Sequence, residues 1–217
     1  GEADGRTDPE PAETRTVTYD ALGRRQELTD DRGVTTWTYD RAGRVTEVSS
    51  PEGTVTYDYD EATGRHTRTW TANTDVRYGY DGLGRLASVT AVKENGEILD
   101  PPRVTVYTYT ATGARAGVAA ANGTGTVYTH DALDRTTGVT HVDSDDDLLA
   151  DYRYTLGPTG RRQAVTETRR EDDGVSTAQV TYVYDALYRL VGEYADGGAR
   201  LPGRTFTALY SYDLVGN

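Results

Sequence analysis

The chain has 217 residues, 35 acidic against 23 basic side chains, and neither cysteine nor methionine. This composition excludes a disulfide scaffold and a thiolate metal site, and the lack of any 18-residue apolar run excludes a membrane-spanning helix. The acidic balance argues against a nucleic-acid partner, because phosphate contacts need clustered Lys and Arg. Only 35% of the residues are hydrophobic, but 17 are tyrosine.

The first segment, residues 1–13, is acidic and polar. It has no apolar core of the kind found in a signal sequence, and we expect it to be flexible. From residue 14 to residue 217 we predict one repeat array of about nine hairpins, truncated inside the last repeat.

A motif of aromatic–x–Tyr–Asp, two further residues and then Gly–Arg recurs along this array. Its second aromatic position falls at residues 19, 39, 59, 80, 109, 130, 154, 184 and 212, and only residue 130 is not a tyrosine there. Fifteen of the 17 tyrosines occupy the two aromatic positions. Self-similarity at such a period is typical of proteins built from stacked supersecondary units.

Each copy of the motif predicts one β-hairpin. Val55, Tyr57 and Tyr59 alternate with polar residues, which is the period of a strand. The Asp that follows can accept a backbone N–H two residues on, and the later Gly can adopt the left-handed conformation of a hairpin turn. The residues to which we assign this structural role are Tyr19, Asp20, Gly23, Tyr39, Asp40, Gly43, Tyr57, Tyr59, Asp60, Gly64, Tyr78, Tyr80, Asp81, Gly84, Tyr107, Tyr109, Tyr182, Tyr184, Asp185, Tyr210, Tyr212 and Asp213.

Four longer gaps between repeats indicate insertions, which we interpret as long hairpin loops on the rim of the sheet. They are KENGEILDPP (93–102), HVDSDDDLLA (141–150), RREDDG (169–174) and ADGGARLPG (195–203). In the first, Asn95-Gly96 is a turn signal, and Pro101-Pro102 is expected to interrupt regular secondary structure. We therefore expect Gly84→Val, in a repeat turn, to be more destabilising than Gly96→Val.

The regularly repeated motif Tyr-x-Tyr-Asp-x-x-Gly-Arg resembles the YD repeat of RHS proteins, found also in shell components of Tc-type toxin complexes and in teneurins. The resemblance extends from Thr16 to Asn217. It implies an all-β fold in which tandem antiparallel hairpins form a curved, spiralling sheet, and a hollow shell that encloses a toxin or passenger polypeptide. It also implies a secreted or bacterial cell-surface protein whose self-cleaving core segment and toxin domain have no counterpart in this chain.

No residues suggest catalysis or a cofactor. The repeat aspartates are explained by turn capping, and the three histidines have no metal-ligand spacing. Asp143, Asp145 and Asp147 resemble the start of a calcium loop, but Leu148 and Tyr154 replace the glycine and glutamate that such a loop needs. We regard these three as weak metal candidates and favour a solvated acidic loop.

The resulting hypothesis is a structural, non-enzymatic wall segment. Its expected partners are the remainder of an RHS-like chain, the enclosed polypeptide and, through unpaired edge strands, further copies of itself. The alternative is a module that binds glycans or a cell-surface partner through exposed Tyr and Arg.

Overall fold

The computed structural model describes residues 14–172, 174–196 and 206–213. The expectations of a flexible segment at residues 1–13 and of a loop at 197–203 concern residues outside this part. The described residues are all-β, and the strands are β1 (Thr16–Tyr19), β2 (Arg25–Asp30), β3 (Gly33–Tyr39), β4 (Val45–Ser50), β5 (Gly53–Tyr59), β6 (His66–Trp70), β7 (Asp75–Tyr80), β8 (Leu86–Glu94), β9 (Glu97–Tyr109), β10 (Arg115–Ala119), β11 (Gly125–His130), β12 (Thr136–Val142), β13 (Leu148–Leu156), β14 (Arg162–Glu171), β15 (Gly174–Tyr184), β16 (Leu190–Asp196) and β17 (Phe206–Leu209). No helix that could cross a membrane occurs among these residues.

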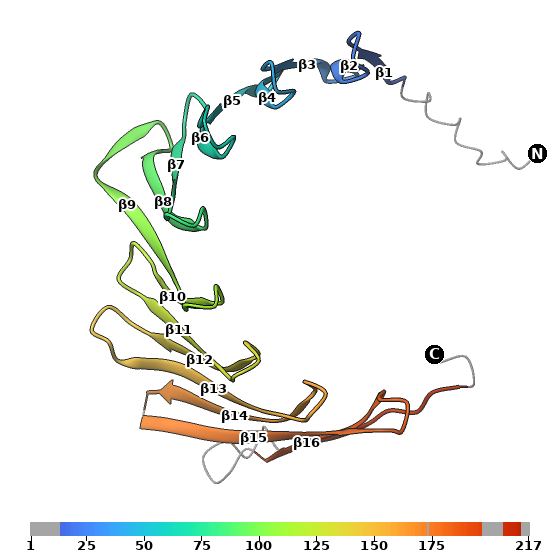
Figure 1. Ribbon diagram of the computed structural model, residues 1–217, viewed down its shortest axis with the longest axis vertical. Helices are drawn as coiled ribbons and strands as arrows, with labels where there is room; N and C mark the ends of the chain where they lie inside the picture. Colours follow the sequence, from blue (N-terminus) through green and yellow to red (C-terminus); the bar gives the residue numbers. More distant parts are fainter. Residues whose placement is uncertain (1–13, 173, 197–205, 214–217) are drawn as a thin grey trace, which may run out of the picture. The chain divides into compact units, whose positions relative to one another are not determined.

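The described strands belong to two units, one within Gly1–Gly79 and Val89–Arg103 and the other within Tyr80–Ser88 and Val104–Asn217. In the first unit, antiparallel ladders join β1 through β7 in chain order. In the second unit, antiparallel ladders join β9 through β17 in the same way, and Figure 1 shows β10 to β16 side by side. The prediction of an all-β fold of tandem antiparallel hairpins is confirmed.

The hairpin turns lie where the repeats predict them. In the first, the Gly23 N–H donates to the Asp20 carbonyl at 3.0 Å, and the Asp20 N–H donates to the Arg24 carbonyl at 2.8 Å. Gly23 has a φ of 76°, a conformation that costs a glycine little and other residues more. The register of the ladder shifts at Thr18/Tyr19, so this repeat tyrosine stands beside a β-bulge. The ladders that end at Tyr39 and Tyr59 shift at the same place in the motif.

Few side chains are fully buried. Among the described residues the buried apolar side chains are Val165, Ala178 and Ala195, which lie on β14, β15 and β16. The repeat tyrosines are mostly half-buried, as is typical of a sheet without a thick core. The low hydrophobic content of the chain is therefore compatible with its fold.

The expectation of long loops at the insertions is wrong in the described part. Residues 93–102 are strand except for a tight turn at Asn95-Gly96, and β9 continues through Pro101 and Pro102 instead of breaking there. Arg169, Arg170 and Glu171 extend β14 along β15, with Glu171 paired to Gly174. Added residues lengthen strands because each new backbone pair makes further ladder hydrogen bonds, whereas a long loop leaves those groups to water. Proline is tolerated in a strand wherever its missing N–H is not needed by a neighbour.

The expected contrast between Gly84 and Gly96 also loses its basis. Gly84 has a φ of 79° and Gly96 a φ of 86°, so both require the left-handed conformation. In addition, the Gly96 N–H donates to the Asn73 carbonyl at 2.9 Å, which fixes that turn to a neighbouring hairpin. A bulky residue is therefore costly at either position.

Candidate functional site

The Asp of a repeat turn holds the turn and its arginine together. In five turns, one carboxylate oxygen accepts the backbone N–H of the Arg four residues on at 2.8–3.0 Å. The other oxygen accepts the Nε–H of the same arginine at 2.6–2.7 Å. The pairs are Asp20–Arg24, Asp40–Arg44, Asp81–Arg85, Asp131–Arg135 and Asp185–Arg189.

These contacts favour the charged form of each carboxylate. The backbone N–H of Arg44 has the largest effect and lowers the pKa of Asp40 below its ordinary value. Desolvation opposes this effect, and the hydrogen bond from the Arg44 side chain lowers the pKa further. The Arg24 backbone N–H has the same leading effect on the pKa of Asp20, as does that of Arg85 on the pKa of Asp81. The repeat aspartates are thus acceptors fixed by their own turns, which leaves them no proton to donate near neutral pH.

The same arginine reaches the tyrosine of the next repeat. The Arg44 guanidinium lies 4.6 Å from the ring centre of Tyr59, within the range of a cation–π contact. Three further pairs have this geometry at 4.3–4.6 Å, and they are Arg24–Tyr39, Arg85–Tyr109 and Arg189–Tyr212. We call the Asp and Arg of one turn together with the Tyr of the next repeat the interlock.

The tyrosine hydroxyl completes the interlock. The Tyr59 O–H donates to the Val45 carbonyl, directly after Arg44, at 2.8 Å. Tyr39, Tyr109, Tyr184 and Tyr212 make the equivalent bond at 2.6–2.8 Å to the residue after the preceding arginine. Burial raises the pKa of Tyr59, which keeps its donor proton in place.

One repeat departs from the pattern at both ends of the interlock. Thr110 and Ala114 occupy the Asp and Arg positions of their turn, and the next tyrosine position holds His130. Where the arginine is absent, the ring that it would cover is also replaced. The departure supports the view that Arg and the following Tyr act as a pair.

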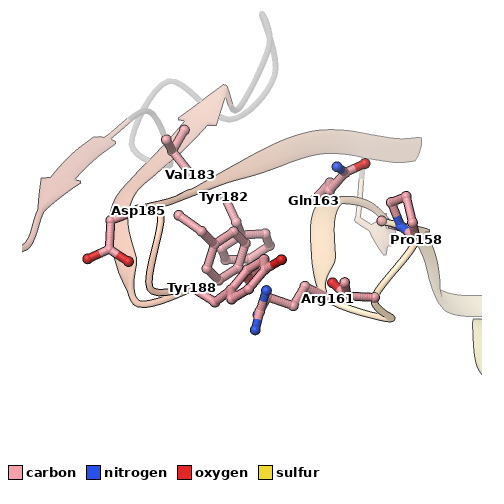
Figure 2. A pocket seen from close by; sticks show the side chains of 10 residues that line it. Pro158, Arg161, Gln163, Tyr182, Val183, Asp185 and Tyr188 are labelled. Atoms are coloured by element: carbon pink, nitrogen blue, oxygen red, sulfur yellow. The ribbon is translucent and has the colours of Figure 1, made fainter.

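A second departure forms a pocket in the second unit, about 550 Å³ in volume (Figure 2). Gly157 stands in the Asp position of its turn, and Tyr188, with a φ of 66°, stands in the Gly position of the next turn. Arg161 has no carboxylate partner among the described residues, and its guanidinium lies 3.5 Å from the ring centre of Tyr188. Gln163 and Tyr182 also line this pocket.

The weak metal candidates are held by an arginine. Asp143 accepts the backbone N–H groups of Asp145 and Asp147 at 3.0 Å, and its other oxygen pairs with Arg170 at 2.6 Å. Asp147 pairs with the same guanidinium. The Asp145 backbone N–H, and then Arg170, lower the pKa of Asp143. Within the described residues no group of three or more His, Asp or Glu side chains is arranged to hold a metal ion.

The remaining predicted residues lie in one turn of variant length and in an aromatic cluster. Asp60, whose turn has one extra residue, accepts the Thr63 hydroxyl at 2.6 Å and the Thr63 N–H at 2.7 Å. His66 lies 4.7 Å from Tyr78 and 5.4 Å from Tyr59 between ring centres. This cluster packs the ends of β5, β6 and β7 together.

The residues to which the sequence assigned no role of their own are the repeat arginines. Each interlock depends on an Arg four residues after an Asp, and the role of that Arg follows from its contact with the tyrosine of the next repeat. The fixed spacing of Arg to the preceding Asp was the available signal.

Comparisons with known proteins agree with this geometry. The RHS Repeat family model matches residues 19–55 and 39–65. No curated protein matches the chain by sequence.

Solved structures extend the likeness over most of the chain. The crystal structure of TcdB2-TccC3-Cdc42 is 17% identical, with a TM-score of 0.53 over 92% of this chain and 12% of that one. The crystal structures of TcdB2-TccC3 and of TcdB2-TccC3 without its hypervariable C-terminal region are each 16% identical, with a TM-score of 0.54 over 92% of this chain and 12–13% of theirs. At such identities the likeness shows the fold alone, and this chain spans about an eighth of the length of those chains. The repeated motif, the match of the RHS Repeat model to residues 19–55 and 39–65, and the shared fold all liken this chain to RHS-repeat, or YD-repeat, proteins.

Proposed function

We propose that this chain is a wall segment of a hollow β-shell that encloses a toxin or passenger polypeptide. A structural role for RHS repeats agrees with the family match and with the shared fold. The proposal adds a passenger inside the shell, a longer RHS-like chain of which this array is a part, and a secreted or cell-surface location.

The observation that carries the proposal is the interlock. Arg44 is bound to Asp40 in its own turn and to Tyr59 in the next, so each hairpin is fastened to its neighbour by side chains as well as by the ladder. A wall needs this kind of nearest-neighbour fastening because each repeat contacts only the repeats beside it.

The alternative function, a glycan-binding surface, is less well supported. An aromatic ring binds a sugar through an open face. In four repeats the arginine of the preceding turn already covers one face of the tyrosine ring, and the rings are those of Tyr39, Tyr59, Tyr109 and Tyr212. The tyrosine column is thus better suited to holding repeats together than to stacking on sugars.

The wall can be tested by limited proteolysis of the longer RHS-like protein that carries this array. We expect its passenger to resist protease in the wild-type protein and to be cut faster when Arg44→Ala and Arg85→Ala loosen two interlocks. The matched control is Arg41→Ala, since Arg41 lies in the same turn as Arg44, is exposed, and makes no ion pair among the described residues.

Two outcomes would contradict the proposal. One is a wild-type protein whose passenger is cut as fast as the isolated passenger. The other is equal passenger protection in the Arg41 control and in the interlock variant, with the variant shown to be loosened by hydrogen exchange.

A further inference from the structure

We propose that the turn at residues 157–161 binds a carboxylate-bearing small molecule in the place of its missing aspartate. The backbone of this turn is the same as in its neighbours. The Gly157 N–H donates to the Arg161 carbonyl at 2.7 Å, and the Gly160 N–H donates to the Gly157 carbonyl at 2.9 Å. Gly160 has a φ of 84°, as the glycines of the other repeat turns do.

The three donors that hold a carboxylate in the other turns are all present here. In a complete turn, the Asp81 carboxylate accepts the Leu83 N–H, the Arg85 N–H and the Arg85 Nε–H at 2.7–2.9 Å. The equivalent groups at this turn are the Thr159 N–H, the Arg161 N–H and the Arg161 side chain. Gly157 supplies no side-chain acceptor, and within the described part of the chain none of these donors has one.

No neighbouring carboxylate takes the place of the missing aspartate. The Asp185 carboxylate lines the same pocket, but it is bound to Arg189 at 2.7 Å and to the Leu187 N–H at 2.9 Å. A Cβ added to Gly157 would lie 3.2 Å from the Gln163 amide nitrogen, so a further donor stands beside the position of the missing side chain.

The pocket also holds the arginine ready for a ligand. Figure 2 shows Arg161 extended toward Tyr188, and the 3.5 Å stacking covers a face of the guanidinium and leaves its edge for hydrogen bonds. Charge-assisted bonds from an arginine and two backbone N–H groups are the chemistry by which a carboxylate is recognised. The volume of about 550 Å³ is enough for a small organic acid.

Acetate is the probe for the test, and its binding is detected by nuclear magnetic resonance of the backbone amides. At constant ionic strength, we expect sodium acetate but not sodium chloride to shift the Thr159 and Arg161 amides in a saturable way. The Leu83 and Arg85 amides are the internal control, because the Asp81 carboxylate already occupies their site.

Two variants identify the site. Gly157→Asp restores the aspartate of the other turns and should weaken acetate binding at least about tenfold, while its matched control Gly157→Ala should retain it. Arg161→Gln should weaken binding to a similar degree. The Gln163 side chain can move to admit the new Cβ, and circular dichroism checks that each variant is folded.

Two further acids rank the sources of the carboxylate. D-Glucuronate carries its carboxylate on a sugar, and N-acetyl-L-aspartate carries its carboxylates on an amino acid. The acid that binds more tightly than acetate identifies which of these two classes of ligand the turn recognises. The proposal is overturned if none of the three acids gives saturable shifts, or if folded Gly157→Asp binds acetate as well as the wild type. Neither result bears on passenger protection by the wall.

Discussion

The guanidinium of Arg44 lies over the ring of Tyr59, 4.6 Å from its centre, although the two residues belong to successive repeats. The same arginine is anchored at 2.6 Å to Asp40, so its position over the ring is fixed by its own turn. The contact converts a local turn motif into a fastening between hairpins. The contribution of the interlock to stability can be measured by substituting its three residues one at a time.

Removal of the arginine should loosen two hairpins at once. We expect Arg44→Ala to lower the melting temperature by about 2–4 °C or more, because it removes the ion pair with Asp40 and the stacking on Tyr59. Calorimetry against Arg41→Ala measures the effect. Equal melting temperatures for the two variants would show that the interlock does not contribute to stability.

Removal of the tyrosine hydroxyl tests the other end of the interlock. Tyr59→Phe keeps the ring under Arg44 but leaves the Val45 carbonyl without its donor, at a cost of about 1 kcal/mol in the free energy of unfolding. Urea unfolding gives this value. Tyr194→Phe is the control, because Tyr194 is 44% exposed and lies outside the repeat positions. A similar loss of stability in this control would contradict the explanation.

The turn glycines can be tested within one loop. Gly84→Ala should cost about 1 kcal/mol, since residue 84 has a φ of 79°. Gly82→Ala should be neutral or slightly stabilising, since nothing lies within 4 Å of the added Cβ. The comparison fails if both variants unfold at the same urea concentration.

The repeat aspartates make the free energy of unfolding depend on pH. The pKa of Asp40 is lower in the folded chain than its ordinary value of 3.8, so its contribution is fully present above about pH 4 and is lost as the pH falls through the lowered value. Urea midpoints measured between pH 7 and pH 2.5 should fall steeply below pH 4. In Asp40→Asn the fall should be smaller, and an unchanged slope would contradict the assignment.

Self-association through a sheet edge stays a prediction from the sequence. An unpaired edge strand offers a row of backbone donors and acceptors to a second copy of the chain. Light scattering over a range of concentrations should show species heavier than the monomer, and a monomer at the highest concentration would count against the idea.

The sequence by itself determined the all-β class, the turn positions and the pairing of consecutive hairpins. These follow from short-range rules: alternation sets the strands, and an Asp followed three residues later by Gly sets the turn. The repeat register was readable because most copies obey the same local chemistry.

The tertiary structure decided the role of the arginines and the site at Gly157. The partner of Arg44 is the tyrosine of the next repeat, and Arg161 lies beside Tyr188 of the next hairpin, so neither contact can be read from one turn alone. The structure likewise decided that the proline pair continues β9, because the need for a proline N–H depends on the neighbouring strand. Local patterns fix a hairpin, whereas the contacts between hairpins depend on which side chains the register brings together.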